Sequence, residues 1–225
     1  MERMTEQTVA APTVIWSRPE EERAGTPLLV LLHGYGANEQ DLFGLVPSLP
    51  EEFTVVSVRA SLAAGPGFAW FPLKNDLSFS LQAVKDTTST LTNWLDGVKD
   101  QHSSVTLLGF SQGMGVATSL LRHRPADFAA VVGLSGFAFK AEGADNEDNF
   151  FDDARLAERQ VPLFWGRDQE DPIIPAEAVE FTNSWLREHT KLTKVLYGNM
   201  GHGINAQELG HVNEFLKLTV LAPKG

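Results

Sequence analysis

The segment VTLLGFSQGMG, residues 105–115, contains the pattern that decides how this chain is interpreted. Residues 105–108 form a short apolar run typical of a buried strand, and residues 114–123 have the apolar spacing of a helix. Between them, GFSQG at residues 109–113 matches the G-x-S-x-G pattern of a serine placed on a sharp strand-to-helix turn. The segment therefore predicts that Ser111 is a nucleophile at the carboxyl end of a sheet, with a helix N-terminus behind it.

Apolar runs that end in small or polar residues recur along the chain, at residues 28–32, 54–58, 129–132, 161–165 and 194–197. These runs are apolar on both faces, as expected of parallel strands that helices cover on each side. Segments with helical periodicity alternate with them, at residues 77–98, 176–189 and 207–220. The alternation predicts a doubly wound α/β fold, with a mostly parallel central sheet and helices on both faces. We expect residues 14–17 to add an edge strand.

Two segments interrupt this alternation. Residues 63–72 are rich in Gly, Pro and aromatic side chains, which favours a shaped loop. Residues 141–153 carry six acidic residues and little periodicity, which favours a solvated loop or a small flap. Since neither is long enough for a second domain, we expect a flexible tail at residues 1–13 and a single domain at residues 14–222.

Composition excludes several classes of protein. The chain has 225 residues, of which 43% are hydrophobic, so it can bury one substantial core. A formal net charge of −11 argues against binding to a nucleic-acid backbone, which needs a basic surface. The absence of cysteine excludes disulfides, thiolate zinc sites and a thiol nucleophile. No apolar stretch is long enough for a signal peptide or a membrane span, so the expected location is the cytoplasm.

His202 is the expected general base. A serine triad on this kind of scaffold occurs in the chain order Ser, then Asp or Glu, then His. His189 and His211 fall in segments with helical periodicity. His202 instead lies in the glycine-rich stretch GNMGHG, residues 198–203, directly after an apolar run. A loop at that edge of the sheet can bring the imidazole to the serine.

Two aspartates are candidates for the acid that orients this histidine. Both lie in GRDQEDPIIP, residues 166–175, after the apolar run that ends at residue 165. Asp171 is preferred, because the proline that follows it keeps its backbone out of helical geometry. Asp168 is the alternative; otherwise we expect it to be a surface carboxylate or to stabilise the loop.

The turn LLHGYG, residues 31–36, predicts one half of an oxyanion hole. We expect the backbone N–H of Tyr35 to act together with that of Gln112, the residue after the nucleophile. His33 is expected to be structural. Ser135, in GLSG after another apolar run, is a rival serine for which a structural turn is expected, because no helical pattern follows it.

Substrate-lining residues are harder to predict. Phe68, Trp70 and Phe71 could line an acyl groove, or they could form an aromatic plug between the loop and the sheet. Met114, three residues after the nucleophile, could shape the pocket behind the serine.

Five segments in this order resemble one known family: LLHGYGANEQDL, AWFPL, GFSQGM, GRDQEDPIIP and GNMGHGI. They are similar to the phospholipase/carboxylesterase family, which includes acyl-protein thioesterases and bacterial serine esterases, and the resemblance extends from about residue 28 to residue 216. It implies an α/β-hydrolase fold without a large cap, no cofactor, and activity on carboxylic esters, with thioesters or lysophospholipids as substrates of some members.

The resemblance also assigns roles to residues. The nucleophile, acid and histidine of the family fall on Ser111, Asp171 and His202, and its oxyanion amides fall on Tyr35 and Gln112. The chain departs from the usual pattern at two places. The spacing from the glycine to the acid is usually shorter, closer to that of Asp168, and a glycine is frequent where this chain has Met114.

Together these patterns predict a serine carboxylesterase that hydrolyses short- to medium-chain esters through an acyl-enzyme. The alternatives are an acyl thioesterase or lysophospholipase with the same three residues, and a catalytically inactive binding protein on the same fold. The expected partner is a small-molecule ester or thioester. We expect no metal or other cofactor, no nucleic acid and no stable membrane insertion, with a monomer or homodimer as the assembly.

Overall fold

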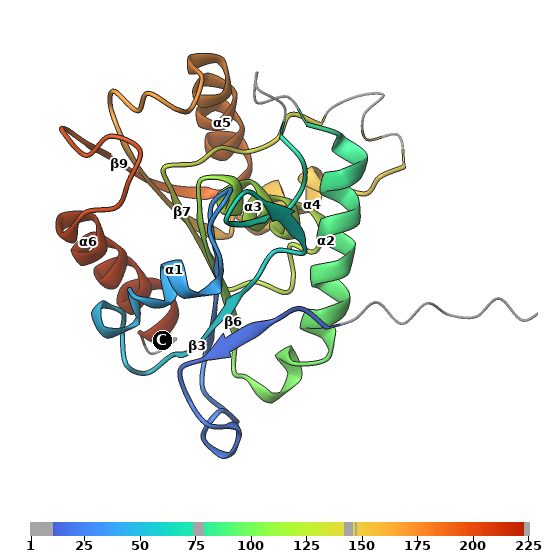
Figure 1. Cartoon of the computed structure of the whole chain (residues 1–225), viewed down its shortest axis with the longest axis vertical. Coiled ribbons are helices and arrows are strands. Elements are labelled where there is room, and N and C mark those ends of the chain that lie inside the picture. Colours follow the sequence, from blue (N-terminus) through green and yellow to red (C-terminus); the bar gives the residue numbers. More distant parts are fainter. Residues whose placement is uncertain (1–10, 74–78, 142–145, 147, 223–225) are drawn as a thin grey trace, which may run out of the picture.

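A mostly parallel sheet forms the centre of the protein in the computed structural model, which describes residues 11–73, 79–141, 146 and 148–222 (Figure 1). Within these residues the sheet has seven strands in the order β1-β3-β2-β6-β7-β8-β9. Their bounds are β1 Val14–Trp16, β2 Leu28–Leu32, β3 Thr54–Val58, β6 Val105–Phe110, β7 Ala130–Leu134, β8 Pro162–Asp168 and β9 Lys191–Tyr197. Only β1 runs antiparallel, against β3, so the predicted edge strand is confirmed.

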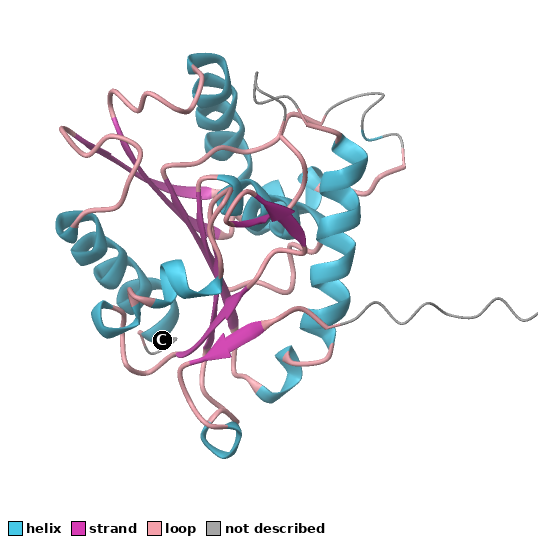
Figure 2. Ribbon diagram, in the orientation of Figure 1, coloured by secondary structure: helices cyan, strands magenta, loops and turns pink. Residues whose placement is uncertain are grey.

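Helices cover both faces of the sheet, as predicted (Figure 2). The helices are α1 Glu39–Phe43, α2 Leu81–Asp96, α3 Gln112–His123, α4 Asp153–Arg159, α5 Ala176–His189 and α6 Ala206–Leu216. Short 3₁₀ turns occur at Glu20–Glu22, Val46–Ser48 and Lys99–Gln101, and a π-helical turn at Lys217–Leu221 follows α6. In Figure 1, α6 and α1 lie on one side of the sheet and α2 lies on the other.

The alternation of side chains along each strand divides the core into two layers. In β2, Leu28, Val30 and Leu32 pack with residues of α2 to α5, whereas Leu29 and Leu31 pack with residues of α1 and α6. Every residue of β2 is buried, because both faces of this central strand are covered. Burial on both faces explains why this strand is a continuous apolar run in the sequence.

Several elements differ from the sequence-based expectations. The segment expected to be a loop contains a hairpin, β4 Leu62–Ala64 with β5 Gly67–Ala69, which Gly65 permits through its positive φ of 60°. The short helices α1 and α4 were not expected; the side chains of Asn38 and Asp152 cap their N-termini.

The termini of the chain and the acidic segment are described only in part. Residues 1–10, most of the expected tail, lie outside the described residues, as do 142–145 and 147 of the expected flap. The rest of that segment forms turns before α4. Among the helices of the described chain, none combines the length and the apolar character needed to cross a membrane.

Candidate active site

Ser111 lies between β6 and α3 on a strained turn. Its φ of 52° and ψ of −116° are rarely adopted by residues other than glycine. The two glycines of the pentapeptide make this turn possible. A Cβ at Gly109 would lie 2.2 Å from the carbonyl oxygen of Gly113, and one at Gly113 would lie 1.9 Å from the carbonyl oxygen of Leu32. No other residue type fits either position without a shift of the backbone.

The hydroxyl of Ser111, the ring of His202 and the carboxylate of Asp171 form a continuous row. His202 Nε2 lies 3.0 Å from Ser111 Oγ, and Nδ1 lies 2.9 Å from Asp171 Oδ2. The three residues come from the ends of β6, β8 and β9, which are far apart in sequence but lie at the same edge of the sheet. A hydroxyl, an imidazole and a carboxylate in this order can move a proton from the hydroxyl to the ring.

Asp171 is the aspartate that meets the imidazole. Its other carboxylate oxygen, Oδ1, accepts the backbone N–H groups of Ile173 and Ile174, at 2.8 and 3.3 Å. Its side chain has no exposed surface. These bonds fix the carboxylate in one orientation, with Oδ2 directed at His202.

Asp168 lies at the end of β8 and holds the loop that carries the histidine. Its carboxylate accepts the backbone N–H of Gly201 at 2.8 Å, that of Met200, and that of Glu170 at 2.7 Å. These N–H donors, with Glu170 the strongest, keep the pKa of the Asp168 carboxyl below its ordinary value despite its burial. The structure thus gives the two aspartates different contacts: Asp171 meets the ring of His202, and Asp168 holds the backbone of the loop that carries it.

Ser135 also contacts the histidine loop. It is fully buried after β7, and its hydroxyl donates to the carbonyl of Gly203 at 2.9 Å. Asp168 and Ser135 therefore hold the backbone on either side of His202. The expectation that Ser135 is structural agrees with this contact, but nothing in the sequence indicated that its partner would be the histidine loop.

The turn after β2 presents two amides near the nucleophile. The backbone N–H of Tyr35 makes no hydrogen bond to the residues that the structure describes, and the N–H of Gln112 belongs to the first turn of α3, where the helix supplies no acceptor. His33 stabilises the turn from beneath: its Nδ1 donates to the carbonyl of Gly34 at 2.7 Å, and its Nε2 accepts the N–H of Ala60 at 3.1 Å. Because it is fully buried, the pKa of His33 is lowered and the ring stays neutral.

A pocket of about 430 Å³ surrounds the Ser111 hydroxyl. Its walls are largely apolar, and Tyr35 and Ile173, each half exposed, stand at its rim. The lining residues are Gly34, Tyr35, Ala37, Asp41, Leu73, Phe110, Ser111, Gln112, Phe137, Ile173, Ile174 and His202. The ring of Phe110 also packs against that of His202, at 5.2 Å between centroids. Such a pocket can hold an apolar chain next to the hydroxyl.

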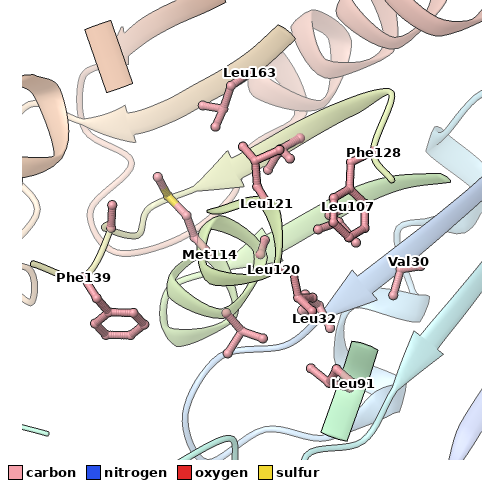
Figure 3. Packing of buried hydrophobic residues seen from close by; sticks show 14 of the residues in the cluster. Val30, Leu32, Leu91, Leu107, Met114, Leu120, Leu121, Phe128, Phe139 and Leu163 are labelled. Atoms are coloured by element: carbon pink, nitrogen blue, oxygen red, sulfur yellow. The ribbon is translucent and has the colours of Figure 1, made fainter. Parts of the chain in front are cut away.

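The four residues expected to line the substrate pocket do not line it. Phe68 packs against the core beneath the guanidinium of Arg59. Trp70 and Phe71 are buried and border a separate cavity of about 260 Å³ beside α2. Met114 is fully buried between α3 and β7, among the core side chains that Figure 3 shows. The alternative of an aromatic plug describes Trp70 and Phe71 correctly.

The side chain of Gln112 explains why this aromatic segment is drawn inward. Its Oε1 accepts the backbone N–H of Trp70 at 3.0 Å, and its Nε2 donates to the carbonyl of Phe71 at 2.8 Å. The indole N–H of Trp70 donates in turn to the carbonyl of His33 at 2.8 Å. The nucleophile turn and the oxyanion turn are therefore joined through one buried segment, a role for the Gln112 side chain that the sequence did not suggest.

Metal ligands are not grouped at this site. Among the residues that the structure describes, no three or more His, Asp or Glu side chains are placed to hold a metal ion.

The fold and the Ser111–His202–Asp171 row define the class of protein: an α/β hydrolase. The family model of the phospholipases and carboxylesterases matches residues 17–220, so the chain belongs to this family, whose members are hydrolases of the carboxylesterase type. The resemblance found in the sequence is thereby confirmed.

Individual relatives are distant. The Bacillus subtilis protein MhqD is 23% identical over 205 residues, which is 89% of this chain and 98% of that protein. Acyl-protein thioesterase 2 of Zea mays superposes with a TM-score of 0.75 at 20% identity, covering 92% of this chain and 99% of the other. A Bacillus cereus carboxylesterase gives a TM-score of 0.73 at 20% identity, covering 95% and 97%. At these identities the solved structures establish the shared fold.

Proposed function

We propose that this protein is a serine carboxylesterase in which Ser111, His202 and Asp171 form the catalytic triad. The observation that carries the proposal is the continuous row from Ser111 Oγ to His202 Nε2, at 3.0 Å, and from His202 Nδ1 to Asp171 Oδ2, at 2.9 Å. These are the contacts that a general base and its orienting acid need.

In the proposed mechanism, His202 takes the proton of Ser111 as its oxygen attacks the acyl carbon. Asp171 accepts the Nδ1–H of the ring and stabilises its charged form. The backbone N–H groups of Tyr35 and Gln112 donate to the oxyanion that develops on the carbonyl oxygen. Return of the proton to the leaving alcohol gives an acyl-enzyme, and His202 then activates a water molecule that releases the acid.

The shape of the pocket supports short- to medium-chain acyl esters as substrates. Leu73, Phe137 and Ile174 supply apolar walls within a volume of about 430 Å³, which suits a chain of limited length. The proposed surroundings are the cytoplasm, and the proposed assembly is a monomer or a homodimer. A panel of p-nitrophenyl esters of graded length tests the chain preference; a maximum at about sixteen carbons contradicts it.

The decisive experiment compares Ser111→Ala with Ser184→Ala, a matched change at an exposed serine of α5. We expect Ser111→Ala to lower kcat for esters by several orders of magnitude and to abolish labelling by a fluorophosphonate probe. The Ser184→Ala variant is expected to keep both. Near wild-type ester hydrolysis by Ser111→Ala would refute the triad, and an unlabelled, inactive wild-type protein would favour an inactive binding protein instead.

An acyl thioesterase or lysophospholipase is the second candidate, because the same row of side chains serves thioesters equally well. Thioesterase 2 of Zea mays has the same fold as this chain. Comparing kcat/KM for an acyl thioester, a lysophospholipid and a simple oxyester of equal chain length distinguishes these candidates.

A further inference from the structure

A second cavity, of about 400 Å³, borders the loop that carries Asp171. We call this cavity the Arg167 cavity; its polar lining includes Arg167, Gln169, Glu180, Asn183 and Lys194. Residues 169–175, here called the acid loop, line both the Arg167 cavity and the pocket beside Ser111, and Ile174 contributes to each. The acid loop therefore stands between the two.

Two cations are brought together on one face of the sheet at this cavity. Lys194 of β9 is in register with Trp165 of β8, and Arg167 follows Trp165 by two residues, so all three side chains lie on the same face. The guanidinium carbon of Arg167 is 5.9 Å from the centroid of the Trp165 ring, and Lys194 Nζ is 4.8 Å from it. Both positive groups thus gather over a single buried indole.

Neither cation is in direct contact with a carboxylate of the described residues, although the charge of Arg167 acts on the neighbouring carboxyl of Asp168. Within the described part of the chain, Arg167 and Lys194 form no ion pair with any carboxylate, and Arg167 makes no hydrogen bond although only 8% of its surface is exposed. Lys194 Nζ donates to the amide oxygen of Asn183 at 2.8 Å, which carries no charge. The guanidinium nitrogens of Arg167 are not among the fully buried atoms without partners, so its N–H donors face the cavity. Those five donors are open to an acceptor from outside the chain.

The neighbouring carboxylates form no ion pair with the two cations. Asp168, next to Arg167 in the chain, accepts the backbone N–H groups of Glu170 and Gly201 instead. Asp171 lines the cavity, but its carboxylate is fully buried and committed to His202 and to the N–H groups of the acid loop. Glu180 is exposed at the rim and forms no ion pair with either cation among the described residues. Burial, followed by the charges of Arg167 and Arg187, lowers the pKa of Lys194.

We propose that the Arg167 cavity is a binding site for a small oxyanion, either a phosphate group or a carboxylate group of a small molecule. The planar guanidinium of Arg167 offers two parallel N–H donors that match two oxygens of such a group, and Lys194 adds a second charge. The site lies outside the pocket beside Ser111, so it stands independently of the proposed esterase activity.

The test is a calorimetric titration of the full chain with inorganic phosphate at low ionic strength, with sodium chloride as the control for salt. We expect saturable binding of one phosphate per chain. Arg167→Gln should weaken it by about tenfold or more, because each charge-assisted hydrogen bond contributes a factor of that order. Lys194→Gln should weaken phosphate binding less. Glu180→Gln should strengthen phosphate binding, because it removes a negative charge that repels the anion at the rim.

The matched control is Lys191→Gln, which makes the same change of charge on the same strand three residues away, on the opposite face. This variant should bind phosphate as the wild type does. A parallel titration with acetate shows whether phosphate or carboxylate binds more tightly. Absence of saturable binding of both anions to the wild type overturns the proposal, as does equal weakening by Lys191→Gln and Lys194→Gln. If Arg167→Gln does not fold, the comparison of the two lysine variants decides.

Discussion

The carboxylate of Asp168 accepts the backbone N–H of Gly201 at 2.8 Å, and so holds the residue immediately before His202. Asp171, three residues later in the chain, contacts the imidazole itself. Two neighbouring aspartates therefore act on the same histidine in different ways: Asp168 fixes its backbone, and Asp171 fixes its ring. The two roles predict different consequences of removing each charge.

Asp171→Asn should lower kcat by about 10³–10⁴-fold with little change in KM, because the amide favours the wrong tautomer of the ring. Asp168→Asn should lower kcat by about tenfold and also lower Tm, because an amide has only one oxygen for three N–H donors. Ester kinetics and thermal unfolding of both variants check this. A larger loss of kcat in Asp168→Asn than in Asp171→Asn would reverse the two assignments.

The stability that Asp168 contributes should depend on pH in the acid range. Since folding lowers the pKa of this carboxyl below its ordinary value of 3.8, the contribution is fully present above that value and is lost as the pH falls through the lower folded value. The difference in free energy of unfolding between wild type and Asp168→Asn should therefore be constant from pH 5 to 7 and shrink below about pH 4. Denaturant unfolding across this range measures it, and a difference that grows toward acid contradicts the proposed cause.

Ser135→Ala should weaken the other support of the histidine loop. The variant loses the hydrogen bond from the hydroxyl to the carbonyl of Gly203, and leaves this partly buried acceptor without its donor. We expect a loss of about 1–3 kcal/mol in the free energy of unfolding and a several-fold lower kcat, with Ser111 still labelled by a fluorophosphonate. Ser184→Ala is the matched control. Loss of labelling in a folded Ser135→Ala variant would mean that Ser135, and not Ser111, carries the reactive hydroxyl.

The sequence predicted the strands and the long helices well, because strands covered on both sides are continuous apolar runs and helices such as α5 have a clear apolar period. Ala176–His189 is observed with the bounds that the pattern indicated. The short elements were missed for a physical reason. The hairpin β4–β5 has three residues in each strand and α1 has five residues, too few for a period to be visible.

In the candidate site, too, some features could be predicted from local patterns and others could not. The residues of the proposed triad occupy recognisable turns, so Ser111, Asp171 and His202 could be selected from local patterns. Supporting contacts join segments far apart in the chain, such as the bonds from Gln112 to Trp70 and Phe71, and no local pattern encodes them. The sequence left open whether Trp70 and Phe71 line the pocket or form a plug, because aromatic content alone does not say which side of a loop faces the sheet.

Gln112→Ala should destabilise the protein by about 2–4 kcal/mol, because it leaves the buried N–H of Trp70 and the buried carbonyl of Phe71 without partners. The backbone N–H of residue 112 remains, so the folded variant should still react with a fluorophosphonate. Denaturant unfolding measures the loss, with Gln40→Ala, at an exposed position of α1, as the control. An unchanged unfolding midpoint for Gln112→Ala would show that this side chain does not hold the aromatic segment.

Glu208 on α6 predicts an unusual response to alkaline pH. Its carboxyl is fully buried against Gly166 of β8, where neither oxygen has a hydrogen-bond partner among the described residues. This burial raises the pKa of Glu208 from 4.5 to about 8, so the folded state holds a proton that the unfolded state releases.

A carboxyl whose pKa is raised by folding contributes most at low pH, and the stability falls as the pH rises from 4.5 to about 8. Glu208→Gln keeps the shape without the ionisation. We therefore expect the difference in the free energy of unfolding to move in favour of the variant by about 1.4 kcal/mol per pH unit across this interval, and to level off above it. Tyr197 of β9 lies near Glu208. Burial, followed by the Glu208 charge, raises the pKa of Tyr197 further above its ordinary value, so its hydroxyl stays protonated across this interval. Unfolding curves of wild type and variant that stay parallel from pH 5 to 9 would show that Glu208 is ionised in the fold or is reached by water.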